Sequence, residues 1–264
     1  MTVATAGPID YSDVTEIAGN EVTPEALSML YTRYAFGATL CEGRDVLEVA
    51  CGEGAGLGYI ARRARRTVGG DYTPGLLAAA NRHYRGRIPF VRLDAHALPF
   101  RSGSFGVVLL YEALYYLADA SRFVEEARRV LDASGCLVVS TVNPGWADFN
   151  PSPFSTRYLS GEELLALLRD RGFRAQLYGA FPISHHSTRL KAVSAIRRAA
   201  VKLHLIPRTM KGKALLKRLF LGPLALFPAE VGDDGVPYCT PALLRPTAPM
   251  GEFKVLFAVA ECLR

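Results

Sequence analysis

The chain has 264 residues, of which 50% are hydrophobic and 21% charged, and its formal net charge is +6. This length suffices for one α/β domain with insertions, and the composition is too apolar for a disordered protein. The five cysteines are scattered without CxxC spacing, so we expect neither a metal site nor a disulfide framework. The sequence has no signal-peptide pattern and no apolar run of the roughly 18 residues that a membrane span needs, so we expect a cytoplasmic protein.

The first expected element is a helix. Thr23 is a suitable N-cap and Pro24 a suitable first helical residue, and the helix extends to about Leu40. Since this helix precedes the repeating core pattern, residues 1–44 are assigned to an N-terminal helical lid.

Short apolar runs and helical stretches alternate from about Asp45 to Thr141. The helix before residue 136 is expected to stop at Ser134-Gly135. Such alternation predicts a parallel sheet with helices on both faces, which binds ligands at the carboxyl ends of its strands. The predicted strands are 46–50, 67–70, 90–93, 107–110 and 136–141, and the predicted helices are 56–64, 74–84 and 121–131.

Downstream of this core, a loop over Asn143–Tyr158 precedes a helix that starts after Ser160 and stops at Gly172. Two further strands are expected, at 174–181 and 253–262. The predicted fold is therefore a doubly wound, mostly parallel seven-stranded α/β sheet of Rossmann-like type. Its core comprises 45–184 plus 251–264, and 185–250 forms a basic helical insertion before the last strand.

The sharpest motif is the segment Val46–Gly56, VLEVACGEGAG, in which a strand ends in a loop with glycine at every second position. Two cofactor classes compete for such a loop, a nicotinamide dinucleotide and an adenosyl amino acid. The dinucleotide fingerprint G-x-G-x-x-G fails in register, because its third glycine position is Leu57. No G-x-x-x-x-G-K-[ST] sequence exists, which excludes a P-loop.

The pattern E-V-x-C-G-x-G-x-G resembles the first motif of the class I S-adenosylmethionine-dependent methyltransferases, particularly the small-molecule group related to ubiquinone and menaquinone enzymes. The resemblance is firm over residues 45–142, although Phe105-Gly106 stands where the family commonly has Phe-Asp. It implies S-adenosylmethionine as cofactor. It also implies that Gly52, Gly54 and Gly56 lie against the methionine part, which Glu48 helps to orient.

Two further acidic positions complete the expected cofactor site. Asp71 ends the second strand 17 residues after Gly54, where its carboxylate suits both ribose hydroxyls, and Tyr72 follows it. The segment DAHALPF from Asp94 resembles the family's D-A-x-x-L-P-F, which implies that Asp94 and the Ala95 amide bind adenine. His96 is interpreted as a turn or surface histidine. Tyr111, at the end of the fourth strand, is also assigned to the cofactor site.

Methyl transfer is an in-line displacement that needs alignment of the reactants, and a base only where the acceptor must lose a proton. Core packing, binding or surface exposure remain alternatives for every candidate near the strand ends. The candidate catalytic residues are Glu112, Tyr115 and His185. The candidate acceptor-binding residues are Tyr34, Tyr116, Trp146 and His186.

The basic excess lies in one segment, because 189–229 holds ten Lys and Arg residues and no acid. Three interpretations of 189–218 stay open: a solvated lid or homo-oligomer face, which we favour, peripheral contact with anionic lipid, or recognition of a phosphorylated acceptor. The segment lacks the interleaved aromatics of a nucleic-acid site, so we expect no nucleic-acid partner.

The predicted function is methyl transfer from S-adenosylmethionine to a small molecule, such as a secondary metabolite or glycan precursor. The first alternative is a cofactor-binding module that does not methylate, such as a cyclase or regulator. The second is a nicotinamide oxidoreductase, which the glycine register disfavours.

Overall fold

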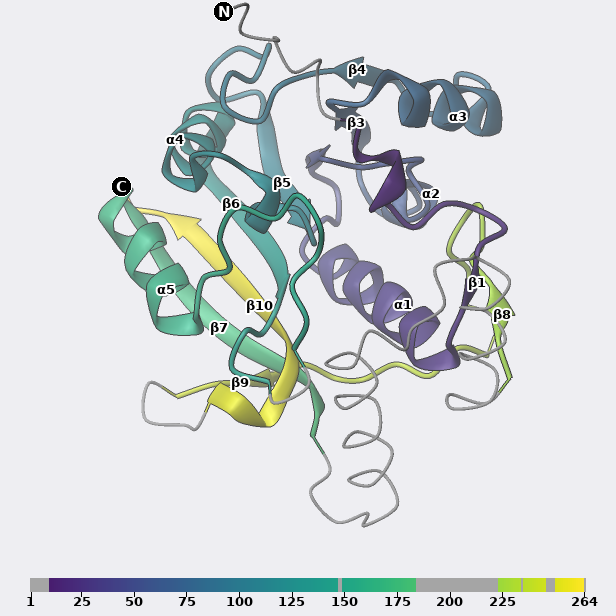
Figure 1. The fold of residues 1–264 in the computed structure, drawn as a ribbon. Helices are drawn as coiled ribbons and strands as arrows, with labels where there is room; N and C mark the ends of the chain where they lie inside the picture. Colours follow the sequence, from purple (N-terminus) through teal and green to yellow (C-terminus); the bar gives the residue numbers. More distant parts are fainter. Residues whose placement is uncertain (1–9, 147–148, 184–222, 234, 246–249, 264) are drawn as a thin grey trace, which may run out of the picture.

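The computed structural model describes residues 10–146, 149–183, 223–233, 235–245 and 250–263 (Figure 1). Eight strands in this part of the chain form one sheet, in the order β4-β3-β2-β5-β6-β10-β7-β9. The strands are β2 (Asp45–Val49), β3 (Arg66–Asp71), β4 (Phe90–Arg92), β5 (Phe105–Tyr111), β6 (Leu131–Val142), β7 (Phe173–Pro182), β9 (Ala242–Leu243) and β10 (Phe253–Cys262).

The mostly parallel α/β sheet is confirmed, and all seven predicted strands belong to it. β2 runs parallel to β3 and β5, while β4 and β6 extend the parallel arrangement on either side. β10 is antiparallel to both β6 and β7. The strand order reverses between β2 and β5, which makes their carboxyl ends the expected ligand position.

Helices cover both faces of the sheet. α4 and α5 pack on one face around Phe123, Leu164 and Leu168, whereas α1 and α2 pack on the other around Leu30 and Ile60. Figure 1 shows these two groups on opposite sides of the strands, with α3 beside α2. The helices are α1 (Pro24–Ala38), α2 (Leu57–Ala61), α3 (Pro74–Tyr84), α4 (Ala120–Val130) and α5 (Gly161–Asp170), and the 3-10 turns are η1 (Tyr11–Asp13), η2 (Leu114–Tyr116) and η3 (Met250–Glu252).

Local chemistry sets most helix starts. Thr23 Oγ1 accepts the Ala26 amide at the start of α1, and Ser160 with Glu163 forms a capping box at the start of α5.

The expected stop of α4 at Ser134-Gly135 is wrong. Leu131 is already extended and pairs with Phe105, so the chain passes from α4 straight into β6.

Parts of 223–245 join the core. β8 (Ala225–Leu226) pairs with β1 (Glu21–Val22), and Phe227 and Val231 pack in the cluster that holds α1 and α2. The helices expected over 189–221 lie outside the described residues. No helix in the described part of the chain is long and apolar enough to cross a membrane.

Candidate functional site

A cavity of about 670 Å³ lies at the carboxyl ends of the parallel strands. Its wall includes the residues that directly follow four neighbouring strands: 50–53 after β2, 71–72 at β3, 93–96 after β4 and 111–113 at β5. This is the ligand position of open parallel sheets, because the loops there diverge and leave a crevice. The size falls in the range of small-molecule sites.

The glycine loop after β2 turns through left-handed backbone conformations. Ala50, Gly52 and Gly54 have φ of 57°, 58° and 77°. Gly52 lines the cavity, whereas Gly54 is fixed from behind by the Tyr84 hydroxyl, which donates to its carbonyl over 2.6 Å. A Cβ at Gly56 would collide with the Tyr34 ring. The last two glycines therefore shape the loop without lining the cavity.

Glu48, on β2, is buried to 1% exposure in the wall of the cavity. Its Oε1 accepts a hydrogen bond of 2.6 Å from the Tyr34 hydroxyl, and its Oε2 is buried without a hydrogen-bond partner among the described residues. Burial raises the pKa of Glu48 to about 8. Such an unsatisfied carboxyl oxygen is costly unless a ligand donates to it.

Asp71 is buried where β3 ends, and its carboxylate faces the same cavity. Its Oδ2 accepts the Gly52 amide and its Oδ1 accepts the Thr73 amide, each over 2.8 Å. Burial raises the pKa of Asp71 against the opposing effect of these amides. Asp71 thus fixes the glycine loop, while further lone pairs remain on both oxygens.

Asp94 and Ala95 line the cavity beyond β4, with the Asp94 side chain 53% exposed. His96 binds the Asp94 carboxylate through its backbone amide and its imidazole. Tyr72 is 38% exposed and packs edge-on against Tyr11. Asp94 and Ala95, the residues expected to bind adenine, therefore lie together in the cavity wall.

Two tyrosines from opposite elements meet at the floor. Tyr34 of α1 and Tyr111 of β5 make an edge-to-face contact with ring centroids 5.3 Å apart. The Tyr111 hydroxyl is buried with no hydrogen-bond partner in the described structure. It fits there because α1 has Gly37 at this point, where a Cβ would strike that hydroxyl.

Glu112 follows β5 in a strained backbone conformation, with φ of 51°. Its Oε1 accepts from the Ser140 hydroxyl over 3.0 Å and lies 3.6 Å from the Arg33 guanidinium. The Tyr115 hydroxyl donates to its Oε2 over 3.4 Å. These contacts hold a carboxylate in the cavity wall at the switch point of the sheet.

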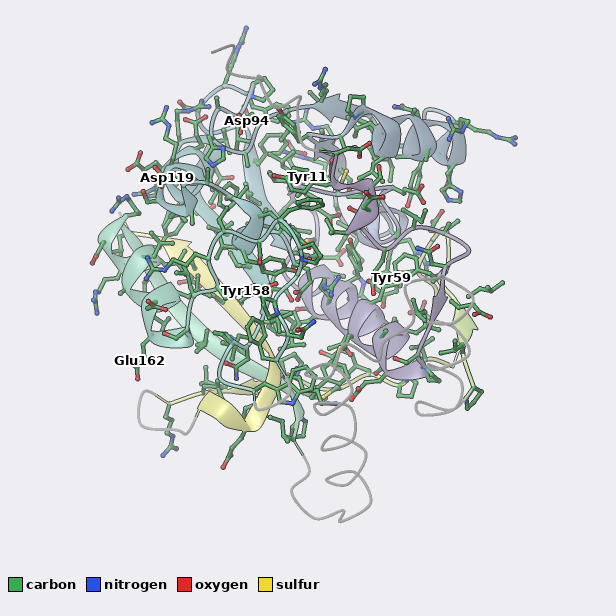
Figure 2. All side chains as sticks on the ribbon, in the orientation of Figure 1. Tyr11, Tyr59, Asp94, Asp119, Tyr158 and Glu162 are labelled. Atoms are coloured by element: carbon green, nitrogen blue, oxygen red, sulfur yellow. The ribbon has the colours of Figure 1, made fainter. Side chains whose placement is uncertain are left out.

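Aromatic side chains form the wall around Glu112. The Tyr115 ring stacks on Tyr158 with centroids 4.4 Å apart, and Tyr116 packs against Tyr11. Ser152 and the Tyr116 hydroxyl are hydrogen-bonded over 2.6 Å. Figure 2 labels Tyr11 and Tyr158, which come from the segment before α1 and from the loop between β6 and α5 and lie near the middle of the molecule.

The segment before α1 closes another side. Tyr11, Thr15 and Glu16 line the cavity. The Thr15 methyl carbon lies only 3.1 Å from where a Cβ of Gly52 would be, and Glu53 accepts the Ala18 amide over 3.0 Å. A side chain at Gly52 would therefore push this segment outward.

The structure brings most of the predicted site residues into one wall, except Gly54, Gly56 and Trp146. Trp146 instead lies under the Lys254 ammonium, at 5.2 Å from the ring centroid. His185 and His186 lie outside the described residues. The predicted residues in the wall are Tyr34, Glu48, Gly52, Asp71, Tyr72, Asp94, Ala95, Tyr111, Glu112, Tyr115 and Tyr116.

Sequence reasoning missed Tyr11, Thr15, Arg33, Ser152 and Tyr158, all in the cavity wall. The sequence did single out Arg33, because it is one of only two Lys or Arg residues in the acidic stretch before residue 49. The others lie in segments without hydrophobic periodicity, and their positions depend on long-range packing.

The charge of the wall is strongly acidic. The described wall contains one Lys or Arg residue, Arg33, against the acidic residues Glu16, Glu48, Glu53, Asp71, Asp94 and Glu112, of which Glu48 has a pKa raised to about 8 by burial. A ligand with positive charge, or with several hydrogen-bond donors, suits this lining.

Comparison with known proteins agrees with this geometry. Residues 47–139 match the family model described as a methyltransferase domain. A "probable S-adenosylmethionine-dependent methyltransferase" of Mycobacterium tuberculosis is 38% identical over 164 residues, which cover 60% of this chain and 58% of the relative. "Phthiotriol/phenolphthiotriol dimycocerosates methyltransferase 1" of Mycobacterium ulcerans is 36% identical over 163 residues, 58% of this chain and 59% of the relative. The chain thus spans under two thirds of these relatives' length.

Solved structures share the fold. A possible histamine N-methyltransferase of Thermotoga maritima aligns with a TM-score of 0.58 at 16% identity, covering 90% of this chain and 91% of its own. A [4+2]-cyclase aligns with a TM-score of 0.57 at 19% identity, covering 94% of this chain and 88% of its own. Residues 47–139 thus carry a methyltransferase domain, and the relatives and the fold support the class I S-adenosylmethionine-dependent family that the first motif predicted. The cofactor of this family is S-adenosylmethionine.

Proposed function

We propose that the protein transfers a methyl group from S-adenosylmethionine to an uncharged small-molecule acceptor at a hydroxyl group. One observation carries the proposal. Three carboxylates, Glu48, Asp71 and Asp94, stand on or just after the neighbouring strands β2, β3 and β4 and line one cavity with Glu112.

The residues fit the cofactor along its length. Glu48 Oε2 is buried and free to accept from the α-ammonium group. Asp71 has carboxylate lone pairs for the ribose hydroxyls, and Asp94 and Ala95 suit the adenine edge. When bound, S-adenosylmethionine supplies an electrophilic methyl group on a sulfonium. Its positive charge suits the acidic wall.

The glycine loop and two tyrosines support this site. Gly52 keeps the loop backbone open to the ligand, while Gly54 and Gly56 set the loop's shape from behind. Tyr72 lines the cavity next to Asp71. Tyr111 has a buried hydroxyl at the floor of the cavity. Tyr34 acts through Glu48, whose carboxylate it binds.

At the acceptor end, Glu112 is the proposed general base. Its carboxylate is held by Arg33, Ser140 and Tyr115 and is directed at the cavity. Burial, with Glu112 nearby, raises the pKa of Tyr115. Tyr115 therefore stays protonated near neutral pH and serves as a donor that orients Glu112, and not as a second base.

The walls define the acceptor class. Arg33 is already opposed by Glu112, so the described wall has no surplus positive charge for a phosphorylated or carboxylated acceptor. Aromatic and aliphatic groups surround the remaining space, including Tyr11, Tyr116 and Phe154. Relatives named for phthiotriol and phenolphthiotriol, which are alcohols by name, support a hydroxyl acceptor.

The experiment is transfer of label from [methyl-14C]S-adenosylmethionine to a panel of uncharged phenols and lipophilic alcohols, each paired with its phosphorylated form. We expect labelled product only from the uncharged members. Labelling of the phosphorylated members alone would contradict the acceptor class.

One alternative is supported by a specific observation, the fold shared with a [4+2]-cyclase. Binding of S-adenosylhomocysteine without label transfer to any acceptor in the panel would favour this non-methylating function. The cytoplasmic location, the homo-oligomer and the peripheral role of 189–218 stay predictions.

A further inference from the structure

The loop after β4 carries a histidine whose two ring nitrogens are both engaged. His96 Nδ1 lies 2.7 Å from Asp94 Oδ1, which also accepts the His96 backbone amide over 2.9 Å. Partial burial opposes ionisation of Asp94, but these two donors outweigh it and hold the pKa of Asp94 below its ordinary value. Both donors act on one oxygen, which fixes the carboxylate and leaves Oδ2 for a ligand.

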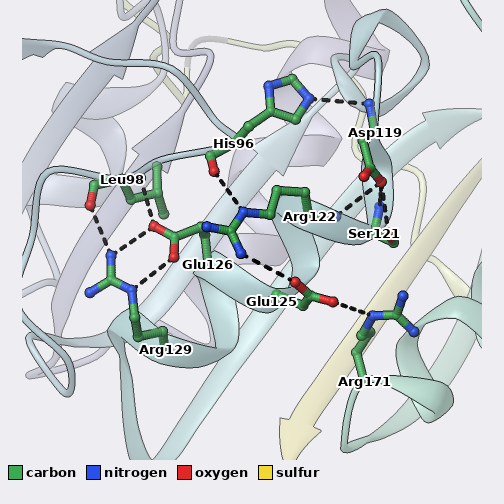
Figure 3. A network of polar contacts seen from close by, with 9 residues as sticks. All are labelled: His96, Leu98, Asp119, Ser121, Arg122, Glu125, Glu126, Arg129 and Arg171. Carbon is green, nitrogen blue, oxygen red and sulfur yellow. Dashed lines mark hydrogen bonds and ion pairs between the residues drawn. The ribbon is translucent and has the colours of Figure 1, made fainter.

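The other side of the ring contacts helix α4 (Figure 3). His96 Nε2 accepts the backbone amide of Asp119 over 3.2 Å, and Asp119 is the N-cap of α4. A backbone N–H only donates, so Nε2 carries no proton and Nδ1 is the nitrogen that donates to Asp94. The imidazole therefore joins the Asp94 carboxylate to the start of α4.

The same helix holds the loop at three further points, as Figure 3 shows. Arg122 Nε donates to the His96 carbonyl over 3.2 Å. Glu126 accepts the Leu98 amide over 2.8 Å, and Arg129 donates to the Leu98 carbonyl over 2.9 Å while it pairs with Glu126. Hydrogen bonds to α4 therefore fix the backbone of this loop on the core of the protein.

We propose that His96 is a positioning residue for cofactor selectivity, which sets the Asp94 carboxylate to accept from the 6-amino group of adenine. This inference rests on the proposed cofactor site. An ordinary surface histidine would explain the contact with Asp94, but not the second contact with Asp119. A fixed carboxylate prefers an amino group, which donates, and repels the 6-oxo group of hypoxanthine, which accepts.

The test measures two dissociation constants, for S-adenosylhomocysteine and for S-inosylhomocysteine, in the wild type and in His96→Ala. We expect the wild type to prefer the adenosyl ligand and His96→Ala to lower that preference about 3- to 10-fold, by weakening the adenosyl ligand alone. His96→Gln, whose amide both donates and accepts, should restore part of the preference.

His83→Ala is the matched control, because His83 pairs with Glu230 and lies outside the described cavity wall. An unchanged preference in His96→Ala, or equal weakening of both ligands, would overturn the positioning role while the cofactor site stands. Failure of the wild type to bind S-adenosylhomocysteine would overturn the proposed function and this inference with it.

Discussion

The hydroxyl of Tyr34 donates a 2.6 Å hydrogen bond to Glu48 Oε1, so that helix α1 holds the carboxyl group at the floor of the cavity. The Tyr34 ring also packs against Gly56 at the start of α2. One side chain thus joins α1, β2 and the glycine loop. The other carboxyl oxygen, Oε2, is left for the ligand.

Tyr34→Phe keeps the ring and removes only the hydroxyl. Glu48 then loses its one described hydrogen bond, and we expect the affinity for S-adenosylhomocysteine to fall by about 3- to 10-fold. Calorimetric titration measures this change. Tyr59→Phe is the control, because Tyr59 is a buried tyrosine of α2 outside the described wall. Equal losses in the two variants would argue against a role through Glu48.

The stability of the ligand-free protein should depend on Glu48 and on pH. Its folded pKa of about 8 lies above the ordinary 4.5, so between these values the folded state keeps a proton that the unfolded chain has released. The free energy of unfolding therefore falls as pH rises through this window, by on the order of 5 kcal/mol over the whole window. Urea denaturation at a series of pH values measures the slope.

Glu48→Gln removes the titrating group and should flatten that slope, making the variant more stable than the wild type near pH 8. The same variant should bind S-adenosylhomocysteine more weakly, because an amide does not pair with an ammonium as a carboxylate does. Parallel stability curves for the two proteins would show that Glu48 does not titrate in this range.

Gly56→Ala tests the packing of the glycine loop. The added methyl group collides with the Tyr34 ring, and we expect a loss of stability of about 1–3 kcal/mol and a weaker cofactor affinity. Gly58→Ala, two residues later in α2, meets the carboxyl end of the flexible Glu230 side chain and not a buried ring, so we expect its cost in stability to be smaller. Thermal denaturation should therefore separate the two alanine variants.

Glu112→Gln tests the base. The amide cannot take the acceptor's proton, so we expect the turnover rate to fall by roughly 10²- to 10⁴-fold with little change in the affinity for S-adenosylhomocysteine. The measurement pairs single-turnover label transfer with calorimetric titration. Full turnover in the variant would assign Glu112 to structure alone.

Much of the fold was predictable because hydrophobic period and capping are local properties. Phe253–Cys262 and Pro74–Tyr84 have the predicted bounds. The end of α4 was predicted to within one residue, but the start of β6 at Leu131 was not, because it depends on pairing with Phe105, a residue far along the chain. β9 is a two-residue edge strand, too short to give any periodic signal.

The cofactor-binding half of the site could be predicted from the positions where the strands end, because parallel strands bring their carboxyl ends to one edge of the sheet. The acceptor half could be predicted only in part, because Glu112, Tyr115 and Tyr116 were expected there but the side chains that hold them were not. Arg33 reaches Glu112 from a helix, and Tyr158 stacks on Tyr115 from a loop after β6. Neither contact has a sequence signature, since both depend on how α1 and that loop pack on the finished sheet.

The most direct test of the account is calorimetric titration of the wild type and Asp71→Ala with S-adenosylhomocysteine, and of the wild type with NADH. We predict saturable binding of S-adenosylhomocysteine to the wild type, no binding of NADH, and an affinity lowered on the order of 100-fold in Asp71→Ala, which loses the acceptor for two ribose hydroxyls. Absence of S-adenosylhomocysteine binding, or binding unchanged in Asp71→Ala, would contradict the proposed cofactor site.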